Sequence, residues 1–140
     1  MITESKLVSE TEEYFKDMKL KTVREVPLFE NRIDIVVHDK HLSSIIAVEV
    51  KVDKWYRALQ QAVLYRICAD SVYVALSEEF VRRVDVPLME KYGVGLLSVN
   101  GSIKEIIHPN PAKYVQHEKA RNGVRAAILR ERRWGHVKEA

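Results

Sequence analysis

The stretch Ala47-Val48-Glu49-Val50-Lys51-Val52 is the part of the sequence that decides the fold. It continues an apolar, β-branched run that begins at Ile45, and such a run is typical of a buried strand. Residues two apart in a strand share a face, so Glu49 and Lys51 point the same way. Burying a carboxylate and an ammonium is unfavourable unless they are paired or bind a metal. The simplest explanation is an ordinary cross-strand ion pair on a half-exposed face.

Length and composition fit one globular domain. The chain has 140 residues, of which 46% are apolar and 31% are charged. No apolar run approaches the roughly 20 residues of a membrane helix, and no signal peptide is visible. Cys68 is the single cysteine and is expected in the core, so no internal disulfide is possible and a cytoplasmic location is expected.

The charge is unevenly distributed along the chain. Residues 113–140 hold eight Lys or Arg against three Glu, whereas the first 112 residues hold 15 basic and 17 acidic side chains. A basic tail on a nearly neutral body indicates a polyanionic partner, although a solvated helix face would have the same composition.

Hydrophobic periodicity predicts the order of elements. Helices are expected over 3–18 and 54–69, then over 78–84 and 87–92, with Thr3, Asp53 and Ser77 as N-caps. Strands are expected over 21–29, 32–38, 45–52, 71–76, 94–99 and 103–107. This order predicts an α/β fold, a mixed central sheet with helices on its faces, followed by a C-terminal hairpin and a basic helix.

The tail is expected to form its own helical part. Asn110 and Pro111 are expected to cap and open the tail helix, and Asn122-Gly123 is expected to break it. We therefore divide the chain into an α/β domain over 1–110 and a basic helical tail over 111–140, packed on the same domain.

Asp34 is a second charge inside an apolar strand, Arg32 to His38, next to the Glu49 strand. On one face, Asp34 and Glu49 repel each other unless a cation lies between them. Oxygen ligands and several waters suit Mg²⁺ or Mn²⁺, and the Val50 carbonyl is a third candidate ligand. Lys51 is expected to orient a water or stabilise charge on a phosphate. Phosphodiester hydrolysis is the chemistry that these groups would serve.

Asp34, fourteen residues and then Glu49-Val50-Lys51 closely resemble the PD-(D/E)xK nuclease superfamily, which includes restriction endonucleases and archaeal Holliday-junction resolvases. Ile33 replaces the proline that the family places before the aspartate. Gln61-Ala62-Val63-Leu64-Tyr65 resembles the QxxxY motif of the RecB-like branch.

The resemblance covers residues 3–76 and implies a restriction-endonuclease-like αβββαβ core. It also implies that Gln61 and Tyr65 support the site and contact DNA. An acid of the first helix then completes the metal site, with Glu4 preferred to Glu10.

The sequence thus predicts a metal-dependent DNA endonuclease or exonuclease, acting in repair, recombination or restriction. Its small size implies a homodimer or a protein partner that supplies specificity. The side chains predicted to contact DNA are Arg32, Lys54, Arg57, Arg121, Arg125, Arg130, Arg132 and Arg133.

Two alternatives remain open. Instead of a nuclease, the chain would be a nuclease-like module that binds nucleic acid but cleaves poorly, or a structural protein whose tail forms an oligomer. The tail carries an apolar seam suited to the second: Val115, Val124, Ala127 and Ile128.

Overall fold

The computed structural model describes residues 2–112 and 117–139, with side chains described as far as Arg132. Eleven elements follow in order: α1 (Glu4–Lys16), β1 (Lys21–Leu28), β2 (Asn31–His38), β3 (Ile45–Lys51), α2 (Trp55–Tyr65), β4 (Ser71–Ser77), α3 (Glu78–Val81), α4 (Val86–Lys91), β5 (Gly95–Asn100), β6 (Ser102–Ile107) and α5 (Glu118–Glu139). The expected helix–strand order is confirmed, including the αβββαβ start.

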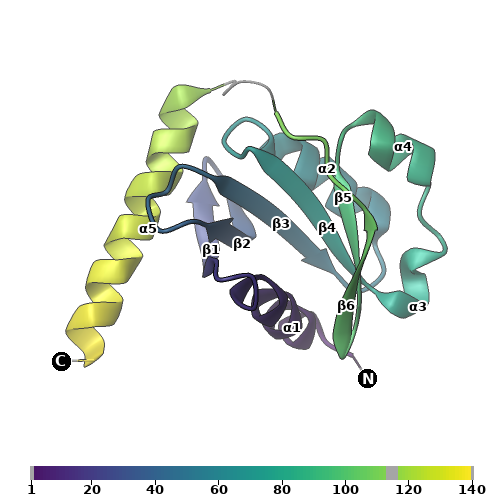
Figure 1. Cartoon of the computed structure of the whole chain (residues 1–140). Coiled ribbons are helices and arrows are strands. Elements are labelled where there is room, and N and C mark those ends of the chain that lie inside the picture. The colour runs from purple at the N-terminus through teal and green to yellow at the C-terminus, as the bar shows by residue number, and fades with distance from the viewer. Residues whose placement is uncertain (1, 113–116, 140) are drawn as a thin grey trace.

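The six strands form one sheet in the order β1 to β6. β1, β2 and β3 are antiparallel neighbours, β3, β4 and β5 are parallel, and β6 returns antiparallel to β5. The parallel pairs arise because α2 and the α3–α4 segment carry the chain across the sheet between successive strands (Figure 1). This mixed sheet flanked by helices confirms the predicted fold class and is consistent with a restriction-endonuclease-like core.

Two apolar clusters lie on opposite faces of the sheet. Val48 and Val50 pack with Leu7 of α1, whereas Ala47 packs with Ala58 of α2 and other buried residues. This is the alternation that a strand buried on both faces requires. β3 is therefore covered by α1 on one side and α2 on the other, and its charged residues lie between two apolar layers.

The ends of α1 and α2 differ slightly from the predictions. Thr3 caps α1 as predicted, since its hydroxyl accepts from the Lys6 amide at 3.2 Å. The helix predicted over 3–18 already ends at Lys16, and Met18 is 50% exposed. The N-cap of α2 is Lys54, one residue later than the predicted Asp53.

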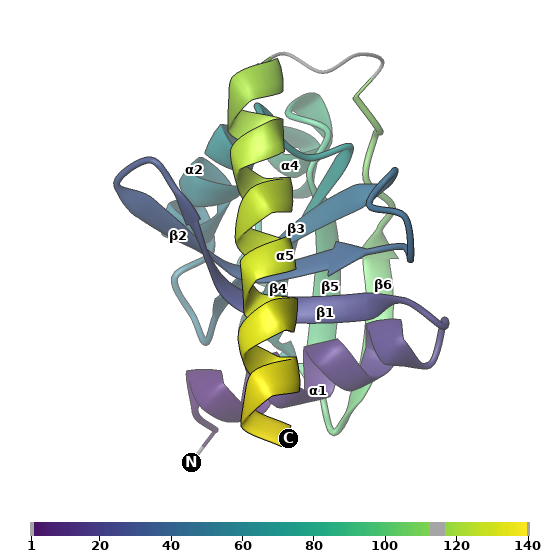
Figure 2. The same ribbon diagram turned by 90° about the vertical axis from the view of Figure 1, so that its left-hand side faces the viewer.

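The tail is one continuous helix from Glu118 to Glu139, so the predicted break at Asn122-Gly123 is wrong. α5 begins at Glu118, not at Pro111, and runs through both residues. Its buried side chains Ala120, Val124 and Ile128 recur at helical spacing and join the core, and this burial outweighs the weak helix propensity of the dipeptide. α5 lies across β1 (Figure 2).

The oligomer seam expected on the tail is therefore largely occupied within the chain. Val124 and Ile128 are almost fully buried against the protein's own core, and Val115 lies outside the described residues. In the described part of the chain, no helix is both long enough and apolar enough to span a membrane.

Candidate functional site

β3 buries Glu49 and carries Lys51 to its end. Glu49 is only 5% exposed, and Lys51 is the last residue of the strand. The antiparallel register pairs Ile35 with Val48. Asp34 of β2 therefore lies beside Glu49, as the predicted hairpin requires.

Tyr65 reaches the Glu49 carboxylate from α2, the helix that covers one face of the sheet. Its hydroxyl oxygen lies 2.7 Å from Glu49 Oε1 and 3.1 Å from the Arg32 carbonyl oxygen, and both are acceptors. Burial, followed by the Glu49 charge, raises the pKa of Tyr65, so its hydroxyl keeps its proton and donates. Tyr65, buried to 1% exposure, thus links the helix of the QxxxY motif to the acid of the E-x-K motif.

Asp34 is held in place by the backbone of β3. The Val50 amide donates to Asp34 Oδ2 at 2.8 Å, which fixes this carboxylate at the strand that carries Glu49. Burial, and then the Asp34 charge, raises the pKa of Glu49 to about 8. Two carboxylates in a poorly solvated place resist being charged together.

Glu4 lies at this site, whereas Glu10 does not. Glu4 Oε1 is 3.5 Å from Lys51 Nζ, so the first residue of α1 pairs with the last residue of β3. Glu10 accepts from the Gly101 amide at 3.1 Å and is bound to the β5–β6 turn instead. Of the two acids proposed from sequence, Glu4 is the one that the fold brings to Lys51.

A cavity of about 250 Å³ opens beside these groups, between α1 and the first three strands. Glu4, Asp34 and Val50 line it, together with Arg24 and Glu25 of β1. The opening gives solvent and ligands a route to Asp34 and to the backbone of Val50.

The sequence did not identify Arg24 and Glu25 as candidates. Glu25 has φ 54, a left-handed conformation uncommon for glutamate, and the register on either side places it opposite Asp34. The Arg32 guanidinium donates to the Glu25 carbonyl at 3.3 Å. Residue periodicity carries no signal for this kink, and only the correct hairpin register would have placed Glu25 next to Asp34.

Arg24 and Glu12 form an ion pair next to the cavity. Their side chains approach to 2.6 Å, and Glu12 also accepts from the Thr22 hydroxyl at 2.8 Å. Glu12 is 7% exposed, so the acidic partner of this ion pair is shielded from solvent. The pair joins α1 to β1 and fixes one wall of the cavity.

The remaining residues predicted near the site are accessible. Gln61 is half-buried one turn before Tyr65 on α2. Arg32, Lys54 and Arg57 are exposed, as contact with a phosphate backbone requires.

The tail arginines divide into two groups. Arg121 is 4% exposed, and its guanidinium donates to the carbonyls of Cys68 and Ser43 and pairs with Asp70 at 3.0 Å. Arg121 stabilises the attachment of α5, and its predicted role as a phosphate contact is corrected. Arg125 is half-buried and donates to the Leu42 carbonyl at 3.1 Å, which is again an attachment of α5.

Arg130 and Arg132 are exposed, while the side chain of Arg133 lies outside the described residues. Of the predicted tail contacts, Arg130 and Arg132 therefore keep the exposure that binding a phosphate requires.

The donor chemistry of the site suits a hard divalent cation. Asp34, Glu49 and the Val50 carbonyl offer oxygen ligands only. Mg²⁺ is usually bound by a few such protein ligands and keeps several of its waters. Among the side chains described, those of residues 2–112 and 117–132, no three of His, Cys, Asp or Glu converge into a metal site. A cation here would thus have two carboxylate ligands at most, with backbone and water completing its shell.

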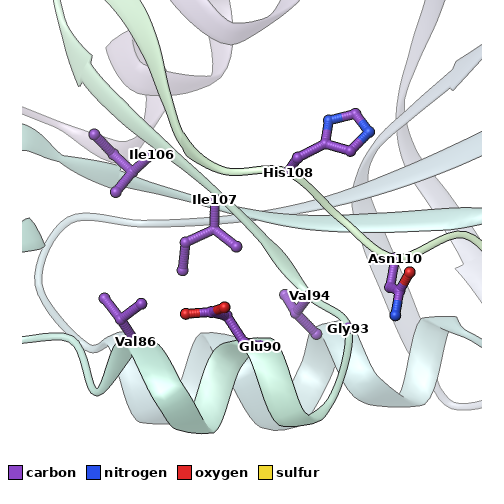
Figure 3. A pocket seen from close by; sticks show the side chains of 8 residues that line it. All are labelled: Val86, Glu90, Gly93, Val94, Ile106, Ile107, His108 and Asn110. Atoms are coloured by element: carbon purple, nitrogen blue, oxygen red, sulfur yellow. The ribbon is translucent and has the colours of Figure 1, made fainter.

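A different cavity, of about 380 Å³, lies between α4 and β6. Glu90 is the carboxylate that lines it, among the apolar side chains of Val86, Val94 and Ile107, and the His108 ring points away from Glu90 (Figure 3). The described side chains there form no acid–base pair, so this cavity is the weaker candidate for chemistry.

Comparisons with known proteins show the fold. No protein-family model matches the chain and no curated protein matches it. A protein of unknown function from Silicibacter pomeroyi is similar, with a TM-score of 0.75 and 15% identity, over 99% of this chain and 92% of that chain.

Two further solved structures are more distant. A repair endonuclease from Pyrococcus abyssi has a TM-score of 0.49 and 18% identity, over 72% of this chain and 48% of that one. SfsA of Pyrococcus furiosus, solved with Ca²⁺, has a TM-score of 0.45 and 13% identity, over 76% of this chain and 64% of that one. At these identities a similarity concerns the fold and leaves the function to be argued from the site.

Proposed function

We propose that the protein is a metal-dependent nuclease that hydrolyses phosphodiester bonds in DNA. The observation that carries the proposal is the joining of Asp34, Glu49 and Tyr65 across two strands and a helix. The Val50 amide binds Asp34, and Tyr65 binds Glu49, at hydrogen-bond distances of 2.8 and 2.7 Å. A structural ion pair on a half-exposed face would not need a buried carboxylate or this supporting tyrosine.

Asp34, Glu49 and the Val50 carbonyl would hold Mg²⁺ or Mn²⁺. When bound, the ion would withdraw charge from the scissile phosphate and acidify a water. Tyr65 holds the Glu49 carboxylate in one orientation by donating to it. Lys51, whose side chain is 28% exposed, would turn from Glu4 to donate to a phosphate oxygen or to the attacking water.

The exposed basic residues supply the contact with DNA. Arg32, Lys54 and Arg57 lie on the elements that carry the site, and Arg130 and Arg132 lie on α5. Contacts of this kind are to phosphates, so affinity should fall steeply with salt. A second copy of the chain or a protein partner would supply specificity.

A nuclease-like module that binds nucleic acid without cleaving it is the second candidate. It is favoured by one observation: the third acid, Glu4, pairs with Lys51 and does not join Asp34 and Glu49. Metal binding that disappears in Asp34→Asn separates the candidates, because only the nuclease requires a cation there.

The decisive experiment is Mg²⁺- and Mn²⁺-dependent cleavage of duplex, flap, junction and single-stranded DNA. Lys51→Ala is the test variant, and Lys104→Ala, an exposed lysine of β6, is the matched control. We expect cleavage by the native protein and by Lys104→Ala, and a loss of at least about 100-fold in Lys51→Ala. Cleavage that persists in Lys51→Ala would show that the chemistry lies elsewhere.

A further inference from the structure

A groove of about 370 Å³ runs between the tip of the β1–β2 hairpin and α5. It is separate from the cavity of about 250 Å³ that Glu4 and Asp34 line. Leu28 and Phe29 line it from the hairpin, and Ala120, Gly123 and Ala127 line it from the helix. It is therefore a largely apolar surface beside the most exposed aromatic side chain among the described residues.

Phe29 is an unfavourable residue for its position in the turn. It is 66% exposed and has φ 54 in the two-residue turn that closes the pair Leu28–Asn31. Hairpin turns favour glycine or asparagine in this conformation, because a β-carbon is strained there. The Phe29 ring makes an edge-to-face contact with His117, at 5.8 Å between ring centroids, and otherwise stays open to solvent. A strained position that leaves an aromatic ring exposed indicates a role in binding.

Gly123 is likewise an unfavourable residue for its position, on the opposite side of the groove. It lies inside α5, where glycine weakens a helix relative to alanine. A β-carbon added at Gly123 would meet no atom within 4 Å, so packing does not require glycine. The missing side chain keeps the groove open next to Phe29.

The charge around the groove favours an anionic ligand. Lys119 and Arg130 are the charged side chains among its described lining residues, and both are exposed. The neighbouring acids Glu30 and Glu118 are exposed but do not line it. An aromatic face flanked by cations matches a nucleobase with its phosphates, because bases stack on aromatic rings and phosphates bind Lys and Arg.

The groove also lies on the hairpin that leads to the site. Phe29 and Asp34 are joined by β2, and at about 3.3 Å per residue the tip is roughly 15 Å from Asp34. We infer that the groove binds an unpaired base of single-stranded DNA, stacked on Phe29, and so positions that strand for cleavage at Asp34. This inference deepens the proposed nuclease function and rests on it.

The test measures the contribution of the base separately from that of the backbone. Fluorescence anisotropy in EDTA gives the Kd of the full chain for a labelled twelve-nucleotide oligothymidylate and for the same backbone made of abasic units. We expect the native protein to prefer the oligothymidylate about 10-fold, the effect of one stacked base. This ratio should fall to about 1 in Phe29→Gly and stay near 10 in Phe29→Trp.

Two variants guard against indirect effects. Gly123→Leu should raise the thermal midpoint, because it improves helix propensity, yet lower the ratio by filling the groove. Tyr92→Ala removes another aromatic side chain, 43% exposed and elsewhere in the fold, and should leave the ratio unchanged.

Three results would overturn the inference: no oligonucleotide binding by the native protein, equal ratios in native protein and Phe29→Gly, or a native dimer that Phe29→Gly dissociates in sedimentation. The last would show that the groove holds a second copy of the chain. A Phe29-dependent ratio without any Mg²⁺-dependent cleavage would support the base site and count against the nuclease.

Discussion

Two causes disfavour the charged form of Glu49: burial, which is the larger, and the nearby charge of Asp34. Together they raise the pKa of Glu49 to about 8. The protonated acid is therefore favoured by folding. Its contribution to stability is complete below the ordinary pKa of about 4.5 and is lost as the pH rises through about 8. A neutral side chain of the same shape would escape this loss.

We expect Glu49→Gln to be more stable than the native protein in EDTA at pH 9, by about 1–3 kcal/mol, and to have little advantage at pH 5. The amide oxygen still accepts from Tyr65, so packing is kept. Urea unfolding at both pH values measures the difference, with Glu105→Gln, the partner of Tyr73, as control. A variant less stable than native at both pH values contradicts the prediction.

Tyr65 and Tyr73 form a matched pair for testing the hydrogen bond at the site. Both are buried, at 1% and 7% exposure, and both hydroxyls donate to a glutamate, at 2.7 and 2.8 Å. Each Tyr→Phe change should cost about 1 kcal/mol in unfolding free energy. Cleavage should fall about 10-fold or more only in Tyr65→Phe, since only this change frees Glu49. Equal activity in the two variants would remove Tyr65 from the site.

At the scale of elements, the β1–β2 hairpin shows what the sequence could not supply. Alternation and β-branched residues located both strands correctly, but the turn was predicted at Glu30-Asn31 and lies at Phe29-Glu30. Hairpin register depends on the turn, so a shift of one residue changes every cross-strand neighbour. The position of Glu25 opposite Asp34 could not be found for this reason.

In α5 the error was different: a charged side chain was expected to be exposed because it is charged. Arg121 belongs to a basic segment, yet it lies in the interior and compensates Asp70, which also accepts from the Ile45 amide at 2.8 Å. Composition cannot separate a solvated arginine from one that attaches a helix, because both occur in the same charge run. The partners that bury Arg121 are Ser43, Cys68 and Asp70, which are far from it in the sequence. Only the folded structure shows that they surround it.

Arg121→Met should therefore destabilise the protein by about 2–4 kcal/mol, because it removes the cation paired with Asp70 and the donor of two carbonyls. Arg130→Met, an exposed position on the same helix, should change stability by less than about 0.5 kcal/mol. Chemical unfolding of both variants gives the comparison. If Arg121→Met unfolds like the native protein, α5 is not attached through this side chain.

For the whole molecule, the sequence predicted the αβββαβ order and the sheet because strand and helix periods are local properties. Strand spacing pointed to Glu49 and Lys51, and the resemblance to the QxxxY motif pointed to Tyr65. The fold gives Glu49 and Tyr65 a direct hydrogen bond. What the sequence could not supply depends on contacts between distant segments, such as Glu4 with Lys51 and Arg24 with Glu12. These contacts exist only once the layers have assembled.

One such contact between distant segments makes the stability of the whole molecule sensitive to pH. His38 ends β2 at 2% exposure, beside Arg132 of α5, with its Nδ1 2.8 Å from the Asp39 carbonyl oxygen. The same Nδ1 lies 3.4 Å from Arg132 Nη2, so it faces an acceptor and a donor at once. Burial lowers the pKa of His38, and the charges of Arg132 and Lys21 lower it further, whereas Asp39 opposes them.

A lowered pKa means that folding favours neutral His38. Its contribution is complete above the ordinary pKa of 6.5 and is lost as the pH falls from there toward the folded value. The thermal midpoint of the native protein should thus fall between pH 7 and pH 5, and His38→Gln should flatten this fall, since glutamine does not titrate. His41→Gln, at an exposed position in the next loop, should leave the slope as it is. A native slope that His38→Gln does not change would mean that other groups control the acid sensitivity of the fold.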